Sequence, residues 1–182
     1  MALRQVRVLG DPILEKRSKE IKEMTPRLQG IIADMVETMY DQNGVGLAAV
    51  QVGILKRVVV IDCGMEEPEL HVMINPVVAS VSEEEQTGQE GCLSVPGKFG
   101  IVTRPMQATV EFLDENMEPQ TLTGEGLLAR AILHECDHLD GHMFTEMVEG
   151  DLMDVSEMAP EEEEKAEEGA ETAETGETAA EE

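Results

Sequence analysis

Apolar residues recur every three or four positions in two stretches of the chain, which is the spacing of one face of a helix. The first stretch follows Thr25-Pro26, where threonine can cap a helix and proline suits its first position. This pattern predicts an amphipathic helix over residues 26–42 that ends at Asn43-Gly44. The second stretch, Glu125–Leu139 (EGLLARAILHECDHL), predicts another helix that Asp140-Gly141 closes.

Strands are indicated by runs rich in Val and Ile that lack helical spacing. The run over 54–62 (ILKRVVVID) predicts a buried strand, and Asp114–Asn116 predicts a hairpin turn. Further strands are predicted over 70–74, 77–83, 106–113 and 120–123. Asp11-Pro12 carries the start signal seen at Thr25-Pro26 and predicts a short helix. Clustered short strands beside two longer helices indicate an α+β fold, with mostly antiparallel strands packed around a central helix.

The chain of 182 residues has 13 Lys and Arg against 39 Asp and Glu, a formal net charge of −26. Residues 161–182 contain eleven Glu and one Lys and so carry −10, which leaves −16 on the first 160 residues. The low-complexity Glu, Ala, Thr and Gly of the C-terminus cannot bury enough apolar surface to offset the entropy of ordering. We therefore expect one domain over 1–158 and a disordered acidic tail over 159–182.

This acidity excludes the binding of nucleic acid or of an anionic membrane as the main function, because phosphate contacts need clustered Lys and Arg. The sequence contains no run of about 18 apolar residues that would span a bilayer. Met1–Asp11 lacks the apolar stretch of a signal peptide, so we expect a cytoplasmic protein. The three cysteines, Cys63, Cys92 and Cys136, then read as free thiols, metal ligands or a nucleophile.

The strongest chemical signal is His134–His138 (HECDH) on the second predicted helix. Residues four apart lie about 40° from each other around a helix, so both imidazoles face the same way and can bind one metal ion. Glu135 lies beside that face, where its carboxylate can take a proton from an activated water molecule. A catalytic divalent metal usually takes three protein ligands, so the motif predicts a third donor elsewhere. The competing interpretation is a pair of surface histidines beside acids.

The residues that follow this helix are poor candidates for the third ligand. In the pattern H-E-x-x-H-x-x-G-x-x-H the final histidine position holds Phe144, and we expect His142 at the surface. A downstream glutamate ligand stays open, because three acids are available, although none lies on a convincing helix: Glu146, Glu149 and Glu157.

Cys92 is the better candidate for the third ligand. It belongs to Glu90–Ser94 (EGCLS) and precedes a Pro96-Gly97 turn, at the boundary of a strand and a loop. Alone, Cys92 would read as a small buried hydrophobe, but a two-histidine helix needs a third donor, and a thiolate partly offsets the charge of the ion. Cys136 lies about 200° around the helix from His134, so we expect Cys136 in the core.

Gly44–Gln51 (GVGLAAVQ) is the third segment with chemical features. It matches the G-x-G-x-x-A pattern of dinucleotide-binding folds, but that motif needs a strand before it and a helix after it, and here a helix precedes. The glycines instead allow the backbone to approach a substrate closely, and the amide of Gln51 can donate a hydrogen bond to an oxyanion.

Taken together and in this order, Gly44–Gln51, Glu90–Ser94 and His134–His138 resemble the three motifs of the polypeptide deformylase family. The resemblance extends over residues 4–144. The family removes the formyl group from the initiator formylmethionine of new bacterial chains and uses one metal ion, usually Fe²⁺. The metal ligands that the resemblance implies are Cys92, His134 and His138.

The same resemblance assigns roles to other residues. Glu135 becomes the general acid and base, and the oxyanion hole consists of the Gln51 amide and the Leu93 backbone N–H. The substrate backbone and methionine side chain would contact Val45, Gly46, Leu127 and Ala131. The last two precede His134 by seven and three positions, which is the spacing of the ligand face of the helix.

The resemblance implies that the substrate is the N-formylmethionyl end of a nascent polypeptide, which is neutral and compatible with an acidic protein. The donor set suits Zn²⁺ or another divalent metal as well, so Fe²⁺ follows from the resemblance alone. The substrate emerges near the ribosome, but ribosomal RNA would repel the acidic tail. We expect no docking through the tail, no direct binding of nucleic acid and no membrane association. Two other functions stay open: a metallopeptidase, and a non-catalytic metal-binding or acidic interaction module.

Glu90, beside the ligand loop, needs a partner if it is buried. We expect Arg104 to be that partner, with Asp137 as an alternative partner for the same arginine. The competing interpretation places all three charges at the surface. Two features depart from the family: Phe99 stands where some relatives have an arginine, and the chain after Phe144 lacks the long C-terminal helix of some relatives.

Overall fold

Two α-helices and eight strands are described within residues 2–64 and 68–157 of the computed structural model. The helices are α1 (Pro26–Asp41) and α2 (Leu127–Asp140). The strands are β1 (Gly46–Ala48), β2 (Val58–Asp62), β3 (Leu70–Val81), β4 (Glu85–Gly91), β5 (Lys98–Pro105), β6 (Gln107–Leu113), β7 (Pro119–Glu125) and β8 (Met153–Asp154). Three short 3₁₀-helices are η1 (Ala49–Val52), η2 (Phe144–Glu146) and η3 (Val155–Glu157).

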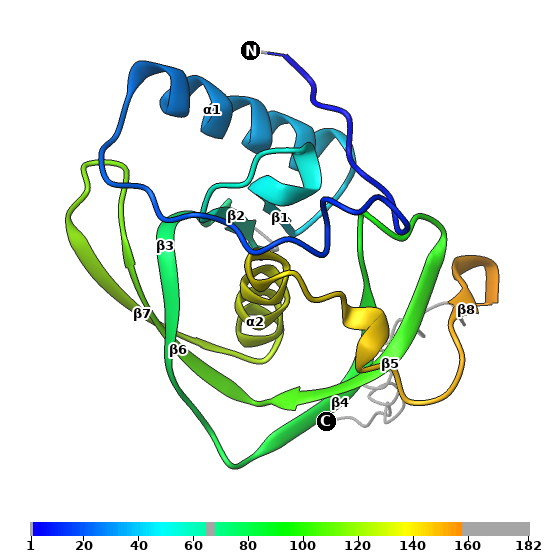
Figure 1. The fold of residues 1–182 in the computed structure, drawn as a ribbon. Helices are drawn as coiled ribbons and strands as arrows, with labels where there is room; N and C mark the ends of the chain where they lie inside the picture. The colour runs from blue at the N-terminus through cyan, green and yellow to red at the C-terminus, as the bar shows by residue number, and fades with distance from the viewer. Residues whose placement is uncertain (1, 65–67, 158–182) are drawn as a thin grey trace, which may run out of the picture.

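The strands form two antiparallel sheets around one helix. The larger sheet has the order β1-β2-β3-β6-β7, and the smaller sheet has the order β4-β5-β8. Helix α2 lies in the centre of the fold, in contact with strands of the larger sheet and with β5 of the smaller one (Figure 1). The predicted α+β class, with mostly antiparallel strands around a central helix, is therefore confirmed.

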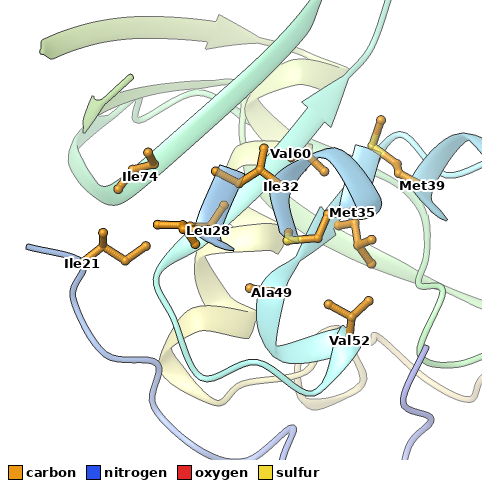
Figure 2. Packing of buried hydrophobic residues seen from close by; sticks show 11 residues of the cluster. Ile21, Leu28, Ile32, Met35, Met39, Ala49, Val52, Val60 and Ile74 are labelled. Carbon is orange, nitrogen blue, oxygen red and sulfur yellow. The ribbon is translucent and has the colours of Figure 1, made fainter. Parts of the chain in front are cut away.

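Helix α1 begins where the sequence predicts. Thr25 Oγ1 accepts a hydrogen bond from the Leu28 backbone N–H at 3.2 Å, and Pro26 is the first helical residue. At the other end, the Gly44 N–H donates to the Met39 carbonyl at 2.9 Å, which fixes where the chain leaves the helix. The buried face of α1 packs into an apolar cluster that Figure 2 shows, with the labelled residues Ile21, Leu28, Ile32, Met35, Met39, Ala49, Val52, Val60 and Ile74.

Two predicted strand boundaries differ from the structure. Strand β2 begins at Val58, four residues later than predicted, and the separate strands predicted over 70–74 and 77–83 are one strand, β3. The register of β3 shifts between Ile74 and Val77, where Asn75 has a φ of 50°. A bulge tolerates a proline such as Pro76, so the strand continues through it. The strands predicted over 106–113 and 120–123 correspond to β6 and β7.

The short helix predicted after Asp11-Pro12 is wrong. Asp11 Oδ1 accepts a hydrogen bond from the Ile13 N–H at 3.0 Å, as a cap does, but the chain then forms turns. The reason is tertiary: the Leu9 N–H donates to the Ser94 carbonyl at 2.7 Å, and the Ser18 N–H donates to the Leu139 carbonyl at 2.8 Å. These two bonds fix both ends of the segment against other parts of the fold. Too few residues lie between them for a stable helix.

Helix α2 begins two residues later than predicted, because Glu125 ends β7 and Gly126 turns the chain with a φ of 56°. Its last turn closes at Gly141 as predicted, with a φ of 87°. Most residues with a side chain avoid this left-handed region of backbone conformation, whereas glycine adopts it without a steric penalty.

We expect Gly141→Ala to lower the free energy of unfolding by about 2–4 kcal/mol. A Cβ added to Gly141 would lie 2.6 Å from the carbonyl oxygen of Glu15, so backbone would have to move as well as adopt a strained φ. Gly150→Ala is the matched control, because Gly150 has a φ of 91° and an added Cβ would have no atom within 4 Å. Urea unfolding of both variants gives the comparison, and equal losses would contradict the role of the contact with Glu15.

The predicted acidic tail over 159–182 lies outside the described residues, so the domain boundary at 158 stays a prediction. Among the helices of residues 2–64 and 68–157, none has the length and apolar character needed to cross a membrane.

Candidate metal centre

The three metal ligands predicted from the sequence come together in the structure. Nε2 of His138 lies 3.2 Å from Sγ of Cys92 and 3.1 Å from Nε2 of His134. All three donor atoms lie within 4.8 Å of one another. Tetrahedral ligands about 2.1 Å from one ion lie about 3.4 Å apart, so this cluster has the dimensions of a metal site. An N, N, S donor set suits a borderline-soft divalent metal such as Zn²⁺ or Fe²⁺.

Helix α2 supplies both histidines from one face, and Cys92 follows directly after the last residue of β4. Cys136 belongs to the same helix but packs into the apolar core, as predicted. Burial raises the pKa of the Cys136 thiol to about 12, and burial likewise raises the pKa of Cys63 to about 11. Both thiols therefore stay protonated at neutral pH, whereas Cys92 shares its site with two imidazoles.

Glu90 orients His134 towards the other two donors. A carboxylate can only accept, so the Nδ1–H of His134 donates to Oε1 of Glu90 at 2.6 Å and Nε2 points to the cluster. Burial disfavours the charged form of His134, but hydrogen bonds with Cys92 and Glu90 outweigh burial and raise its pKa to about 10. Burial and the neighbouring His134 lower the pKa of His138. A divalent cation among the three donors would replace the proton on Nε2 of His134, because histidine ligands bind as neutral imidazoles.

Glu90 is itself held by two buried arginines. Arg104 donates to both carboxylate oxygens, at 2.6 and 2.8 Å, and Arg130 donates to one of them at 2.9 Å. Arg104 also donates to Asp137 at 2.8 Å, so it contacts both of the partners expected for it. Burial raises the pKa of Glu90, but the hydrogen bonds from Arg104 and His134 outweigh burial and hold that pKa well below its usual range. The interpretation that placed all three predicted charges at the surface is wrong, since Glu90 and Arg104 are each 5% exposed.

We expect Glu90→Gln to lower the free energy of unfolding by about 3–5 kcal/mol, because it removes the negative charge between two buried arginines. It should also weaken metal binding about 10–100-fold, because Glu90 orients His134. Urea unfolding and metal titration measure the two effects. The matched control is Glu111→Gln on the exposed face of β6, for which we expect a change within about 0.5 kcal/mol. Equal losses of stability in the two variants would contradict a special role for Glu90.

Glu135 lies beside the cluster, with its side chain buried. Its Oε2 has no hydrogen-bond partner within the part of the chain that the structure describes. Burial raises the pKa of Glu135 to about 7, so the carboxyl group is poised to take up and release a proton near neutral pH. Gly46 lies directly against this carboxylate, because a Cβ on Gly46 would collide with Oε1 of Glu135.

The Gly44–Gln51 segment positions the side-chain amide of Gln51 beside the donor cluster. Its chain forms β1 and η1 after α1, which is the wrong context for dinucleotide binding, as predicted. Oε1 of Gln51 accepts from the Ala48 N–H at 2.8 Å, which fixes the orientation of the amide. Nε2 of Gln51 then donates to Oγ of Ser94 at 3.1 Å and contacts Sγ of Cys92 at 3.4 Å. Gln51 is therefore a rigid donor at the edge of the donor cluster.

A cavity of about 470 Å³ opens beside the cluster. Its lining includes all of the predicted substrate-contacting residues, Val45, Gly46, Leu127 and Ala131, together with Leu93, Gln51 and Glu135. Sequence reasoning missed several further lining residues, among them Arg130 and Val155, as well as the bond from Gln51 to Ser94. Arg130 is a charged residue on the helix that carries the histidines, so the sequence could have indicated that it has a buried acidic partner. No feature of the sequence near Val155 indicates that it lines the cavity.

Three of the downstream residues considered as ligands make other contacts: His142, Glu146 and Glu149. His142 is exposed and pairs with Glu146 at 3.0 Å, as expected for a surface residue. Glu149 accepts a hydrogen bond from Thr103 at 2.6 Å. The side chain of Glu157 lies outside the described part of the chain. Phe144, which stands at the third histidine position of the rejected pattern, is buried and packs on His134 with 5.9 Å between ring centroids.

Comparisons with families, with curated proteins and with solved structures all lead to one family. The family model described as polypeptide deformylase matches residues 3–151. A peptide deformylase from Agathobacter rectalis is 59% identical over 156 residues, which cover 86% of this chain and 96% of that protein. A peptide deformylase from Lachnoclostridium phytofermentans is 54% identical over 163 residues, which cover 90% of this chain and 99% of that protein.

Solved structures show the same fold. A peptide deformylase from Thermotoga maritima superposes with a TM-score of 0.78 at 37% identity, over 82% of this chain and 100% of that one. A peptide deformylase from Synechococcus elongatus, solved in complex with actinonin, gives a TM-score of 0.77 at 41% identity, over 81% of this chain and 79% of that one. Because the family model covers most of the chain and two relatives are 54% and 59% identical over 90% and 86% of it, the chain belongs to the polypeptide deformylase family.

Proposed function

We propose that this protein hydrolyses the formyl amide of N-formylmethionyl peptides and releases formate. The observation that carries the proposal is the position of Glu135, a buried carboxylate with an unpartnered oxygen beside a Cys-His-His donor cluster. Membership of the deformylase family supports the same activity. The substrate would be the formylated start of a nascent polypeptide.

The ligands of the metal ion would be Cys92, His134 and His138, and we propose Fe²⁺ as the ion. The donor set accepts Zn²⁺ equally well, so the choice of iron rests on family resemblance. When bound, a divalent ion supplies Lewis acidity, which polarises the formyl carbonyl and lowers the pKa of water.

Glu135 would act as the general base and then as the general acid. Its carboxylate takes a proton from the attacking water and later gives that proton to the departing amine. A pKa of about 7 supports both steps, because the group can hold or release the proton at neutral pH. The buried setting also keeps bulk water away from the carboxylate.

Gln51 and Leu93 would stabilise the developing oxyanion. Nε2 of Gln51 contacts Cys92 Sγ at 3.4 Å, and this weak contact can be exchanged for a hydrogen bond to the oxyanion. The backbone N–H of Leu93 has no acceptor among residues 2–64 and 68–157, so it is available as the second donor.

The cavity would hold the methionine side chain and the peptide backbone. Ala131 is buried on the face of α2 that carries the histidines, and Leu127 lies one turn earlier on the same face. Gly46 lies against Glu135, where only a residue without a side chain fits. We propose that Val45 completes the apolar contact at the outer edge of the cavity.

The net charge of the protein bears on its partners. The body of the protein carries a net −16, which opposes binding of ribosomal RNA. We therefore propose that the enzyme acts without direct contact with nucleic acid. We also propose the cytoplasm as the place where it meets its substrates.

One experiment separates the three functions that the sequence left open. Purified protein is given a formyl-Met peptide and, separately, a longer peptide with a free amino terminus, and both formate and peptide fragments are measured. Release of formate without fragments supports deformylation, and its inhibition by actinonin would link the activity to the cavity. Fragments of the longer peptide would indicate a metallopeptidase. Absence of both products from metal-loaded protein would indicate a non-catalytic module.

A further inference from the structure

The match to the family model ends at residue 151, yet the next residues return to the cavity. Strand β8 pairs with β5 in the smaller sheet, with Asp154 opposite Lys98 and Met153 opposite Phe99 (Figure 1). The Val155 N–H then donates to the Gly97 carbonyl at 2.9 Å. This backbone bonding fixes residues 153–155 along the loop that follows Cys92.

Val155 lines the same cavity as Glu135 and His134, and its side chain is 47% exposed. The catalytic end of the cavity is deep, since Gln51 is 1% and Glu135 is 3% exposed. Val45 and Leu127, in contrast, are 45% and 50% exposed. Val155, Val45 and Leu127 are therefore exposed apolar side chains at the mouth of the cavity, whose exposed lining also includes the polar residues Gln42, Asn43 and Gln89.

We propose that Val155 binds an apolar side chain of the substrate beyond the methionine and gives the enzyme a preference for such sequences. The inference rests on the proposed function, because it takes the substrate to be a formyl-Met peptide. With the formyl group at the donor cluster, the rest of the polypeptide leaves through the exposed mouth. The residues after the methionine then pass Val155.

The charges near Val155 favour an apolar partner over an acidic one. Lys98 also lines the cavity, but its Nζ lies 3.2 Å from Oδ1 of Asp154, so its charge is already paired. An acidic side chain would have to compete with Asp154, whereas an apolar side chain gains by removing the surface of Val155 from water. The exposed surface of Val155 is removed from water only when a ligand covers it.

The test uses Val155→Thr in the full-length, metal-loaded enzyme, because threonine keeps the branched shape and adds a hydroxyl group. The probes are formyl-Met-Leu-Leu and formyl-Met-Ser-Ser. For the variant we expect a KM about three- to fivefold higher for the Leu-Leu peptide, without a similar rise for the Ser-Ser peptide. The matched control is Val77→Thr, the same change at a valine that is 60% exposed on β3 and does not line the cavity.

The outcomes separate this inference from the proposed function. A wild-type enzyme that favours Leu-Leu, and a loss of that preference in Val155→Thr but not in Val77→Thr, would support the inference. Equal KM changes for both peptides, or no change, would overturn the role of Val155 while leaving deformylation intact. A wild-type enzyme that releases no formate from either peptide would overturn the proposed function and this inference with it. Melting temperatures of both variants confirm that the comparison is made on folded protein.

Discussion

Glu135→Gln is expected to lower kcat for formate release by about three orders of magnitude while the protein keeps its metal ion. Glutamine has nearly the shape of glutamate, so the buried space beside the donor cluster stays filled. It cannot accept a proton from water or deliver one to the amine. The three proposed ligands are unchanged, so metal content should equal that of the wild type.

Two measurements decide the role of Glu135. Formate release is followed with a formyl-Met peptide, and metal content is determined on the same sample by elemental analysis. The matched control is Glu125→Gln, which changes an exposed acid at the end of β7, just before α2, and should retain full activity. Retention of more than about a tenth of the wild-type kcat by Glu135→Gln would contradict general acid–base catalysis by this residue.

The local parts of the site were predictable from the sequence. His134, Glu135 and His138 lie within one helical turn and a half, so the period of the helix alone brings them together. Cys92 and Gln51 come from distant segments. Their side-chain chemistry suggested a ligand and an oxyanion donor, and the family resemblance assigned these roles, but no spacing in the sequence places either residue beside the helix. The bond from Glu90 to His134 and the second arginine on Glu90 depend on how β4, β5 and α2 pack, which no local pattern encodes.

Some elements of the fold were predictable from the sequence and others were not. Helix α1 was predictable because its cap and its apolar spacing agree with the tertiary structure. Strand β4 was missed because its sequence, EQTGQEG, is polar and contains glycine, and its pairing with β5 makes it a strand. Strand β8 has two residues and is likewise defined by its partner, so the position of Val155 became apparent only in three dimensions.

Cys92→Ser is expected to lose the metal ion, with affinity reduced by at least about 100-fold, because it replaces a thiolate with a weakly acidic hydroxyl group. Activity should fall in proportion to the metal lost. The fold should persist, since Cys92 lies in a loop after β4 and is not fully buried. Metal content is measured after dialysis against a chelator, and urea unfolding checks stability.

Cys136→Ser provides the matched control, because it makes the same chemical change on the side of α2 that faces away from the donor atoms. Cys136 is 7% exposed and packs among apolar side chains, so a hydroxyl group there should cost about 1–3 kcal/mol of stability. The metal should nevertheless stay bound, because no donor atom has been removed. The two variants therefore separate ligation from packing: Cys92→Ser loses metal, and Cys136→Ser loses stability. Equal metal loss in both would contradict the assignment of Cys92 as the third ligand.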